Sequence, residues 1–486
     1  MVFNPLKSDR ESMSSVDTAW LRMERPTNLM MITGVMIFDD KLAYRKVQKV
    51  IRDRFLRFAR FRQRAGRDTT SAFWEEDPNF DLDAHVLRVA LPGKADKDAL
   101  QAYASELAST PLDPWKPMWQ FHLVENYLGG SAMVVRIHHS YADGIALIQV
   151  LMAMTETAEG KSPLPEKPKK RAGSGSGDGG AVRLVKHGLN LGARLWNNSL
   201  HIVQDPKVAT SMVKTGVDLA AELAKLALLT DDPPTPFKGS LGARKQVAWA
   251  EPLPLEEVRT IGKALGCTIN DVLLASAAGA LHSYLGEQGE ALDGLVLRAA
   301  VPVNLRPLES AASLGNQFGL VLLDLPVGIS NPLERLYKVH ENMNRLKSSR
   351  QPVATYLLLG ALGLGPAQLQ ETALNILSEK STLVMTNVPG PRQPLYFAGK
   401  EIVQQMFWVP SSGSIGLGIS ILSYDGRVQF GLIADRKCVP EPGEIIKRFR
   451  GEFEKLLLTT LMAPWEERPN AQDVEAHLDF HCSLLG

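Results

Sequence analysis

The segment from Ala132 to Met154 reads AMVVRIHHSYADGIALIQVLMAM, and its hydrophobic pattern indicates a strand, a short turn and a helix. Apolar residues dominate Ala132 to His139, as in a buried strand, and Ser140 to Gly144 supply the small and polar residues of a turn. From Ile145 onward the apolar residues recur at helical spacing. The segment therefore predicts one strand–turn–helix unit of an α/β protein, with two histidines where the strand ends.

The rest of the chain alternates strand-like and helical runs in two parts, which predicts an α/β fold with two domains. Its 486 residues are 45% hydrophobic and 22% charged, an ordinary globular composition. The glycine-rich run GSGSGDGG, Gly173 to Gly180, predicts a flexible linker. We expect an N-terminal domain at 1–172, a flexible linker and helical connector at 173–236, and a C-terminal domain at 237–486.

Charge and cysteine content exclude several classes of protein. The 54 basic and 53 acidic side chains leave a net charge of +1, so we expect no nucleic-acid partner. Cys267, Cys438 and Cys482 are too few and too far apart for a disulfide framework or a cysteine-type zinc site, which favours a reducing compartment. No run approaches the roughly 20 apolar residues that span a bilayer.

One segment, Lys41 to Arg67, is strongly basic and carries an apolar stripe that includes Val47, Ile51 and Phe55. Such a helix suits an anionic lipid surface or a phosphate-bearing ligand. It is also typical of a helix that packs on its own sheet with a solvated charged back, the more common case. The sequence leaves both interpretations open.

The two histidines, His138 and His139, cannot both point at one small centre, because successive strand residues face opposite sides of a sheet. Further ligands at metal-binding spacing are missing, so we expect no metal site. One imidazole at a strand end can act as a general base, since its pKa near 6.5 leaves it mostly neutral at pH 7. The alternatives are a buried, hydrogen-bonded His139 and an Asp143 that merely caps the following helix.

The motif HHSYADG, His138 to Gly144, resembles the HHxxxDG signature of the CoA-dependent acyltransferase superfamily, which includes chloramphenicol acetyltransferase-like enzymes and peptide-synthetase condensation domains. Within it, the chain resembles bacterial wax ester synthase/acyl-CoA:diacylglycerol acyltransferases nearly end to end. The supporting stretches are MSSVDTAWLRME (Met13 to Glu24), PMW (Pro117 to Trp119), TINDVLLA (Thr268 to Ala275), VPVNLRP (Val301 to Pro307), LGNQFG (Leu314 to Gly319) and TNVPGP (Thr386 to Pro391). Two departures are Met118, where the family has Leu, and Asn304, where it commonly has Ser.

The resemblance implies two chloramphenicol acetyltransferase-like domains, with mixed sheets flanked by helices and an active-site tunnel at the domain interface. It implies a long-chain O-acyltransferase of lipid biosynthesis that moves a fatty acyl group from acyl-CoA to a fatty alcohol, giving a wax ester, or to diacylglycerol, giving triacylglycerol. His139 would take the hydroxyl proton in a ternary complex without an acyl-enzyme. Acyl-CoA would be a substrate, and no cofactor is expected.

The resemblance also implies the site residues. The catalytic group would be His138, His139, Asp143, Gly144 and Asn270. Arg306 would be the structural ion-pair partner of Asp143. The residues expected to bind substrate or CoA are Trp119, Asp271, Asn316, Thr386 and Asn387. Independently of the resemblance, Gly360 and Gly363 offer small side chains at helical spacing, where an acyl chain could lie.

Structural roles compete with several of these assignments. Asn270 or Asp271 could instead cap a helix. Asn316, Thr386 and Asn387 could instead stabilise turns, and the two glycines could serve ordinary helix packing. The same resemblance suggests a cytoplasmic protein in peripheral contact with the inner membrane, a lipid droplet or lipid inclusions. Two rival functions remain: a condensation-type acyltransferase that uses carrier-bound acyl groups, and a non-catalytic lipid-surface protein.

Overall fold

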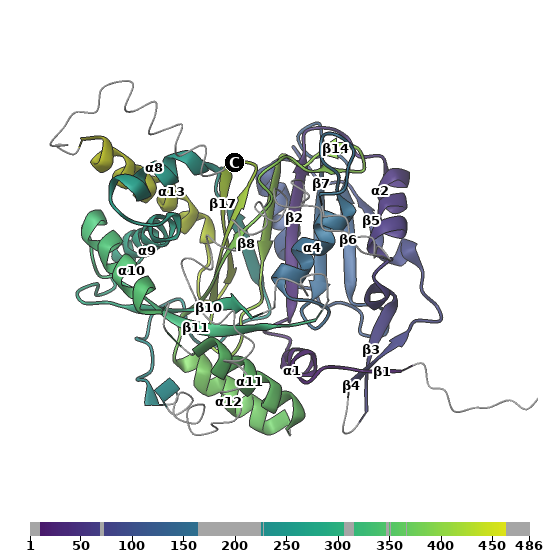
Figure 1. The fold of residues 1–486 in the computed structure, drawn as a ribbon, viewed down its shortest axis with the longest axis horizontal. Helices are drawn as coiled ribbons and strands as arrows, with labels where there is room; N and C mark the ends of the chain where they lie inside the picture. The colour runs from purple at the N-terminus through teal and green to yellow at the C-terminus, as the bar shows by residue number, and fades with distance from the viewer. Residues whose placement is uncertain are drawn as a thin grey trace, which may run out of the picture.

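The computed structural model describes residues 10–68, 72–163, 225–226, 228–305, 315–346, 349, 351–365 and 367–462. Two large β-sheets stand next to each other, one built mainly from the N-terminal half and one from the C-terminal half, with helices on their outer flanks (Figure 1). This arrangement confirms the predicted α/β class with mixed sheets flanked by helices.

The N-terminal sheet has the strand order β15-β2-β7-β6-β5. Its strands from this half are β2 (Met31–Phe38), β5 (Val86–Val89), β6 (Trp119–Val124) and β7 (Ser131–His138). Its helices are α2 (Tyr44–Val50), α3 (Lys97–Ala108) and α4 (Gly144–Met154). A small sheet of β1 (Glu11–Ser12), β4 (Ala72–Glu76) and β3 (Gln63–Arg67) lies below, next to α1 (Ser15–Met23). Every residue of β2 and β7 is buried, because both faces of this sheet are covered.

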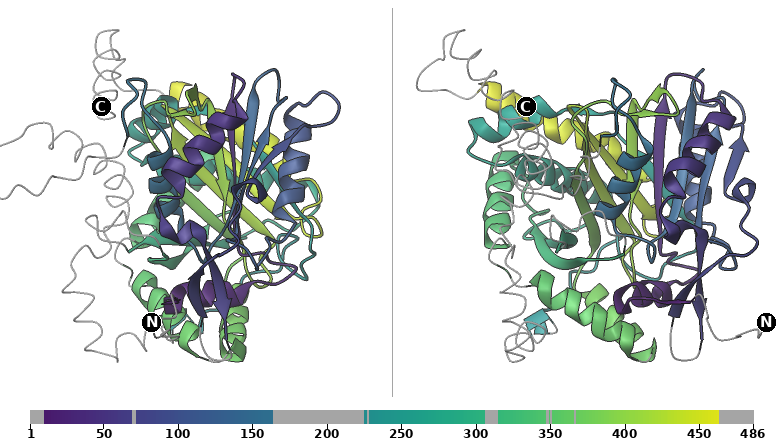
Figure 2. Two further views of the ribbon diagram at one scale, coloured as in Figure 1. Left: turned by 90° about the vertical axis from the view of Figure 1, so that its right-hand side faces the viewer. Right: turned by 45° about the vertical axis from the view of Figure 1, so that its right-hand side comes forward.

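The C-terminal sheet has the order β11-β10-β12-β16-β17-β8, with β9 paired to β17. Its strands are β8 (Lys245–Trp249), β9 (Leu253–Pro254), β10 (Leu297–Asn304), β11 (Phe318–Leu325), β12 (Leu383–Pro389), β16 (Leu417–Tyr424) and β17 (Arg427–Asp435). The helices are α8 (Leu255–Ala264), α9 (Ile269–Glu287), α10 (Pro332–Leu346), α11 (Gln351–Leu364), α12 (Ala367–Glu379) and α13 (Pro442–Met462). The largest core lies between this sheet and α9, whereas α11 and α12 lie beside α1 at one end of the molecule (Figure 2).

One strand crosses between the two halves. β15 (Gln404–Trp408) pairs antiparallel with β2, so Met406 lies opposite Val35 in the N-terminal sheet. Trp408 and Trp249, from the C-terminal half, share a core with Val35 and Val134. The range 237–486 therefore contributes to both sheets, and the predicted boundary at residue 236 does not separate two independent cores. The hydrophobic pattern of β15 could not reveal this, because it fits a strand in either sheet.

The linker predicted at 173–180 and most of the connector lie outside the described residues. The basic segment is helical only in α2 and the π-helix η1 (Ile51–Phe55), because its last residues, Gln63–Arg67, form β3. Its apolar residues Val47, Ile51 and Phe55 are buried on the N-terminal sheet. Arg54 pairs with Glu156, which together with this burial favours the helix-on-sheet interpretation for the helical part of the segment. Among the described helices none is long and apolar enough by itself to cross a membrane, although α8 and α9, bent by 100° at their junction, pass that test as a pair.

Candidate active site

The histidine motif occupies the predicted strand–turn–helix unit. β7 ends at His138, and Asp143 caps α4 by accepting a hydrogen bond from the Ala146 backbone amide at 2.8 Å. Asp143 therefore has the capping role that the sequence suggested as an alternative. Such a cap is stabilising because the first amides of a helix lack partners within the helix. Gly144 is the first residue of α4, and a Cβ there would meet no atom within 4 Å.

The ring of His139 lies in an aromatic slot. Its face stacks on Trp20 of α1, with ring centroids 4.1 Å apart and an interplanar angle of 16°, and Phe318 of β11 lies 5.7 Å away. The residue is only 4% exposed, and its backbone amide donates to the Met30 carbonyl at 2.7 Å. Its buried Nδ1 atom has no hydrogen-bond partner among the described residues. The slot is thus assembled from segments of both halves of the chain.

Burial controls the charge of this histidine. Loss of solvent, with a smaller contribution from the nearby His138, lowers the pKa of His139 to about 4, although contacts with its own backbone and with Asn316 oppose the shift. The imidazole is therefore neutral at pH 7, with a lone pair available for a proton. A neutral buried imidazole is the form that a general base requires.

Asn316 holds the backbone of His139 by a hydrogen bond to its carbonyl oxygen. Its side-chain amide nitrogen donates to the His139 carbonyl at 2.8 Å and to Asp17 Oδ1 at 2.7 Å. The backbone amide of Asn316 also donates to Asp17, and that of Gln317 donates to Asp143 Oδ2 at 3.0 Å. Burial raises the pKa of Asp17 more than these hydrogen bonds lower it. Asn316 therefore connects α1 to the histidine motif, and its own buried Oδ1 lacks a partner among the described residues.

The first histidine, His138, has other partners than His139. Its Nδ1 accepts from the Ser140 backbone amide at 3.1 Å, and its Nε2 lies 2.6 Å from Glu24 Oε2 at the end of α1. Burial raises the pKa of Glu24, but its contacts with His138 and Arg67 outweigh burial and leave the pKa below its ordinary value. His138 therefore connects the motif to the end of α1, through Glu24, whereas His139 contacts Trp20 of the same helix.

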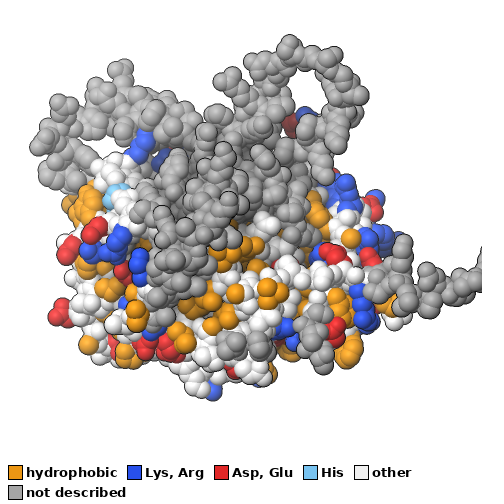
Figure 3. All heavy atoms as spheres, turned by 60° about the horizontal axis from the view of Figure 1, so that its bottom comes forward, with side chains coloured by type: hydrophobic (Ala, Val, Ile, Leu, Met, Phe, Trp, Pro, Cys, Tyr) orange, Lys and Arg blue, Asp and Glu red, His pale blue; other side chains and the backbone are white. Residues whose placement is uncertain are grey.

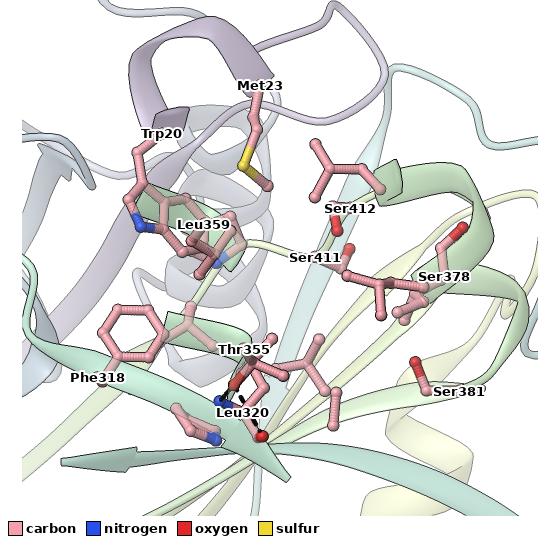
Figure 4. Close-up of a pocket in the computed structure, with 18 of the residues that line it drawn as sticks. Trp20, Met23, Phe318, Leu320, Thr355, Leu359, Ser378, Ser381, Ser411 and Ser412 are labelled. Atoms are coloured by element: carbon pink, nitrogen blue, oxygen red, sulfur yellow. Dashed lines mark hydrogen bonds between the residues drawn. The ribbon is translucent and has the colours of Figure 1, made fainter. Parts of the chain in front are cut away.

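A cavity opens at the ring of His139. It encloses about 980 Å³ of unfilled space, including the part open to solvent, between α1, β10, β11, α11 and α12. Trp20 and Phe318 lie on one side of it, and the serines Ser378, Ser411 and Ser412 lie on the opposite side (Figure 4). Most other lining side chains are apolar. The cavity is thus lined by a neutral imidazole, by apolar side chains and by several hydroxyl groups.

The expected substrate residues of the C-terminal half lie in two places. Asn387 donates to Asn270 at 2.8 Å, so the structure brings these two residues together on the α9 side of the sheet. Thr386 contacts Ser420 on the opposite side, the side from which Val384 lines the cavity.

Asp271 has a structural role in α9. It completes a capping box in which Thr268 is the N-cap residue, and its Oδ2 lies 2.7 Å from His340 Nδ1. Asn270 therefore does not cap α9.

Three further predicted residues have packing surroundings. Trp119 is fully buried, stacks on His85 and donates to the Phe61 carbonyl at 2.8 Å. Gly360 and Gly363 face α1, whereas their neighbours Leu359 and Thr355 line the cavity. We expected these glycines to line an acyl channel, but the structure places them against α1 instead. At Gly363 the backbones of α11 and α1 come close together. Arg306 lies outside the described residues.

Sequence reasoning assigned no role to Trp20, Phe318, Asp17 or Glu24. Three of them lie in MSSVDTAWLRME, a stretch that the family resemblance had already singled out. Their contact with the histidine motif depends on a helix more than 100 residues away in the chain, which no local pattern encodes.

Comparison with known proteins identifies the family of this chain. The profile of the wax ester synthase/diacylglycerol acyltransferase catalytic domain matches residues 13–273, and that of the WS/DGAT C-terminal domain matches residues 314–457. A Mycobacterium tuberculosis protein named as a candidate diacylglycerol O-acyltransferase is 31% identical over 403 residues, covering 79% of this chain and 82% of that protein. Another from the same species, with tgs2 in its name, is 29% identical, covering 79% of this chain and 83% of its own length.

Solved structures share the fold. The wax ester synthase/diacylglycerol acyltransferase from Marinobacter aquaeolei VT8 has a TM-score of 0.66 at 24% identity, covering 93% of this chain and 100% of that chain. The starter condensation domain of rhizomide synthetase has a TM-score of 0.56 at 14% identity, covering 94% of this chain and 96% of that chain. Fold and histidine motif define an acyltransferase of the two-lobed, chloramphenicol acetyltransferase-like architecture. The chain belongs to the wax ester synthase/diacylglycerol acyltransferase family.

Proposed function

We propose that this acyltransferase moves a long-chain fatty acyl group from acyl-CoA to a fatty alcohol or to diacylglycerol, with His139 as the general base. The observation that carries the proposal is the neutral, buried imidazole at the wall of a largely apolar cavity.

The mechanism follows from these groups. The acceptor hydroxyl gives its proton to the imidazole lone pair while its oxygen forms a bond to the thioester carbonyl carbon. When the tetrahedral intermediate collapses, the carbon–sulfur bond breaks and the proton passes from His139 to the CoA sulfur. General-base assistance of this kind contributes roughly 10² to 10⁴ in rate, so positioning of both substrates supplies much of the remainder.

The test is to incubate purified protein with palmitoyl-CoA and either hexadecanol or diacylglycerol, and to follow free thiol release and ester formation. We expect turnover without a carrier protein, and loss of about 10² to 10⁴ in kcat for His139→Gln in a folded protein. Turnover that requires a carrier protein would support the condensation-type alternative. Unchanged turnover in His139→Gln would reject the base assignment.

We also propose that the protein is cytoplasmic and contacts the inner membrane or a lipid inclusion through the end that carries α11 and α12. Leu364 is 82% exposed and Ile376 is 46% exposed, and the same helices line the cavity. Figure 3 shows this end of the molecule, with apolar side chains spread among charged ones. Leu364→Glu with Ile376→Glu should weaken flotation with phospholipid vesicles, whereas Tyr337→Glu on α10 is the control. Equal flotation of all variants would reject this contact surface.

A further inference from the structure

Three side chains of the kinds that bind metal ions meet where α8, α9 and α10 come together. Cys267 lies in the turn between α8 and α9, Asp271 lies in the first turn of α9, and His340 lies on the adjacent helix α10 (Figure 1). Among the residues that the structure describes, these three bring one potential ligand atom each to within 4.8 Å of one another. Because His340 lies 69 residues from Asp271 in the chain, no local spacing pattern could predict this cluster.

Hydrogen bonds already orient two of these side chains. Asp271 Oδ2 accepts a hydrogen bond from the Thr268 backbone amide at 2.8 Å and lies 2.7 Å from His340 Nδ1. On the other edge of the ring, the side-chain amide nitrogen of Asn344 lies 2.8 Å from His340 Nε2. Metal-bound histidines usually make such a contact through their second ring nitrogen, which fixes the orientation of the ring. The cluster therefore has the outer partners that a metal site needs.

The cluster lies at the boundary between the core and the solvent. The Asp271 side chain is only 1% exposed, whereas that of His340 is 31% exposed. Cys267 is half-buried. An ion can therefore reach the buried carboxylate past the imidazole.

The chemistry of the three ligands selects the ion. A thiolate and an imidazole favour Zn²⁺ over Mg²⁺ or Ca²⁺, which prefer oxygen ligands. Zinc bonds of about 2.0 to 2.3 Å place tetrahedral ligands roughly 3 to 4 Å apart, so side-chain shifts of about 1 Å complete the site. Thiolate and carboxylate together carry two negative charges, which balance the ion beside the positive N-terminal end of α9.

We propose that Cys267, Asp271 and His340 bind one zinc ion, with water as the fourth ligand. The ion connects the turn before α9 to α10, and it holds the first turn of α9, which carries Asn270. The inference goes beyond the proposed acyl transfer and does not depend on it, since none of the three ligands lines the cavity at His139.

Binding of the ion moves two protons. Burial, and after it the charge of Asp271, raises the pKa of the Cys267 thiol to about 11, so the ion itself displaces the thiol proton, which passes to the solvent. The ion also takes the lone pair of His340 Nδ1, and the proton on that nitrogen moves to Nε2. The Asn344 amide then turns by half a rotation, so that its oxygen accepts a hydrogen bond from Nε2.

Cadmium tests the thiolate ligand, because it takes the place of zinc and its bond to a thiolate gives an ultraviolet charge-transfer band. The full-length protein is treated with a chelator and titrated with Cd²⁺. We expect the band in the unaltered protein and in Cys438→Ser, and its loss in Cys267→Ser. Cys438 is the matched control because it is also a half-buried free cysteine. A band that is absent from the unaltered protein, or equal in both variants, would overturn the proposal.

Zinc affinity tests the imidazole. His340 is partly exposed, so we expect His340→Gln to fold, and the loss of one ligand should weaken Zn²⁺ binding by at least about tenfold in competition with a coloured chelator. Saturating Zn²⁺ should raise the Tm of the unaltered protein and of Cys438→Ser by about 2 to 5 °C, but not that of His340→Gln or Cys267→Ser. Equal zinc affinity of His340→Gln and the unaltered protein would mean adventitious binding at a thiol and would overturn the proposal.

Discussion

The indole ring of Trp20 lies nearly parallel to the imidazole of His139, with centroids 4.1 Å apart. The two residues come from α1 and from the end of β7, so His139 is covered by a helix that packs on α11 of the other half of the chain. The stacked indole contributes to the desolvation that keeps the imidazole neutral.

Replacement of the indole should therefore alter the acidity of the base. In Trp20→Leu we expect solvent to reach the imidazole, so that the pKa of His139 rises from about 4 toward its ordinary value. The pH at which kcat/KM begins to fall on acidification would rise with it, and Trp20→Phe would shift less. Steady-state kinetics across pH, with thermal denaturation as a folding control, measures this. An unshifted profile in a folded Trp20→Leu protein would contradict it.

The unaltered protein should stay active at unusually low pH. The active form of the base is neutral, so kcat/KM falls only as the pH drops through the pKa of His139, which burial lowers to about 4. We expect a flat profile between pH 8 and about 5, where an ordinary histidine with a pKa near 6.5 would already be losing activity. Samples returned to neutral pH control for unfolding. An acid limb centred near pH 6.5 would show that the imidazole is solvated.

The link between Asp17 and Asn316 should contribute to stability. In a double-mutant cycle with Asp17→Ala and Asn316→Ala, we expect a coupling energy of about 1 to 3 kcal/mol, because each single change leaves a buried partner unsatisfied. Urea denaturation measures the free energies of unfolding. Additive effects of the two changes would mean that the 2.7 Å contact contributes no net stability.

Asp143 should affect folding as well as turnover. It caps α4 and accepts a hydrogen bond from the Gln317 amide, so Asp143→Ala should lose at least about 1 kcal/mol of stability along with activity. Asp143→Asn, which keeps a side-chain oxygen for capping, is the matched control and should lose less. An Asp143→Ala protein of full stability and reduced turnover would point to a direct role in the reaction.

The two glycines of α11 should respond oppositely to alanine. A Cβ at Gly363 would lie 1.7 Å from the Ser15 carbonyl oxygen, so Gly363→Ala must push α1 away and should cost about 1 to 3 kcal/mol of stability. At Gly360 the nearest atom is 3.6 Å away, and alanine should be neutral or stabilise the helix by up to about 1 kcal/mol. Thermal denaturation of both proteins makes the comparison. Equal stability of the two would contradict a close approach of α1 and α11.

The local features of the site were predictable from the residues themselves. The hydrophobic pattern around HHSYADG predicted the strand, the turn and the helix that the structure has. The motif and the family resemblance together predicted the acyltransferase class and the two-lobed fold, which the comparisons confirm. The catalytic role of His139, the Asp143–Arg306 pair and the cellular location stay predictions.

The chain's sequence by itself determined the secondary structure at the motif and the chemistry that the motif offers, because both depend on neighbouring residues. Tertiary structure alone decided that Trp20 covers His139, that Asn316 connects Asp17 to the His139 backbone, and that β15 crosses into the other sheet. It also decided that Gly363 packs on α1 while Leu359 lines the cavity. These contacts join residues far apart in the chain, and burial, which lowers the pKa of the imidazole, exists only once both halves have packed together.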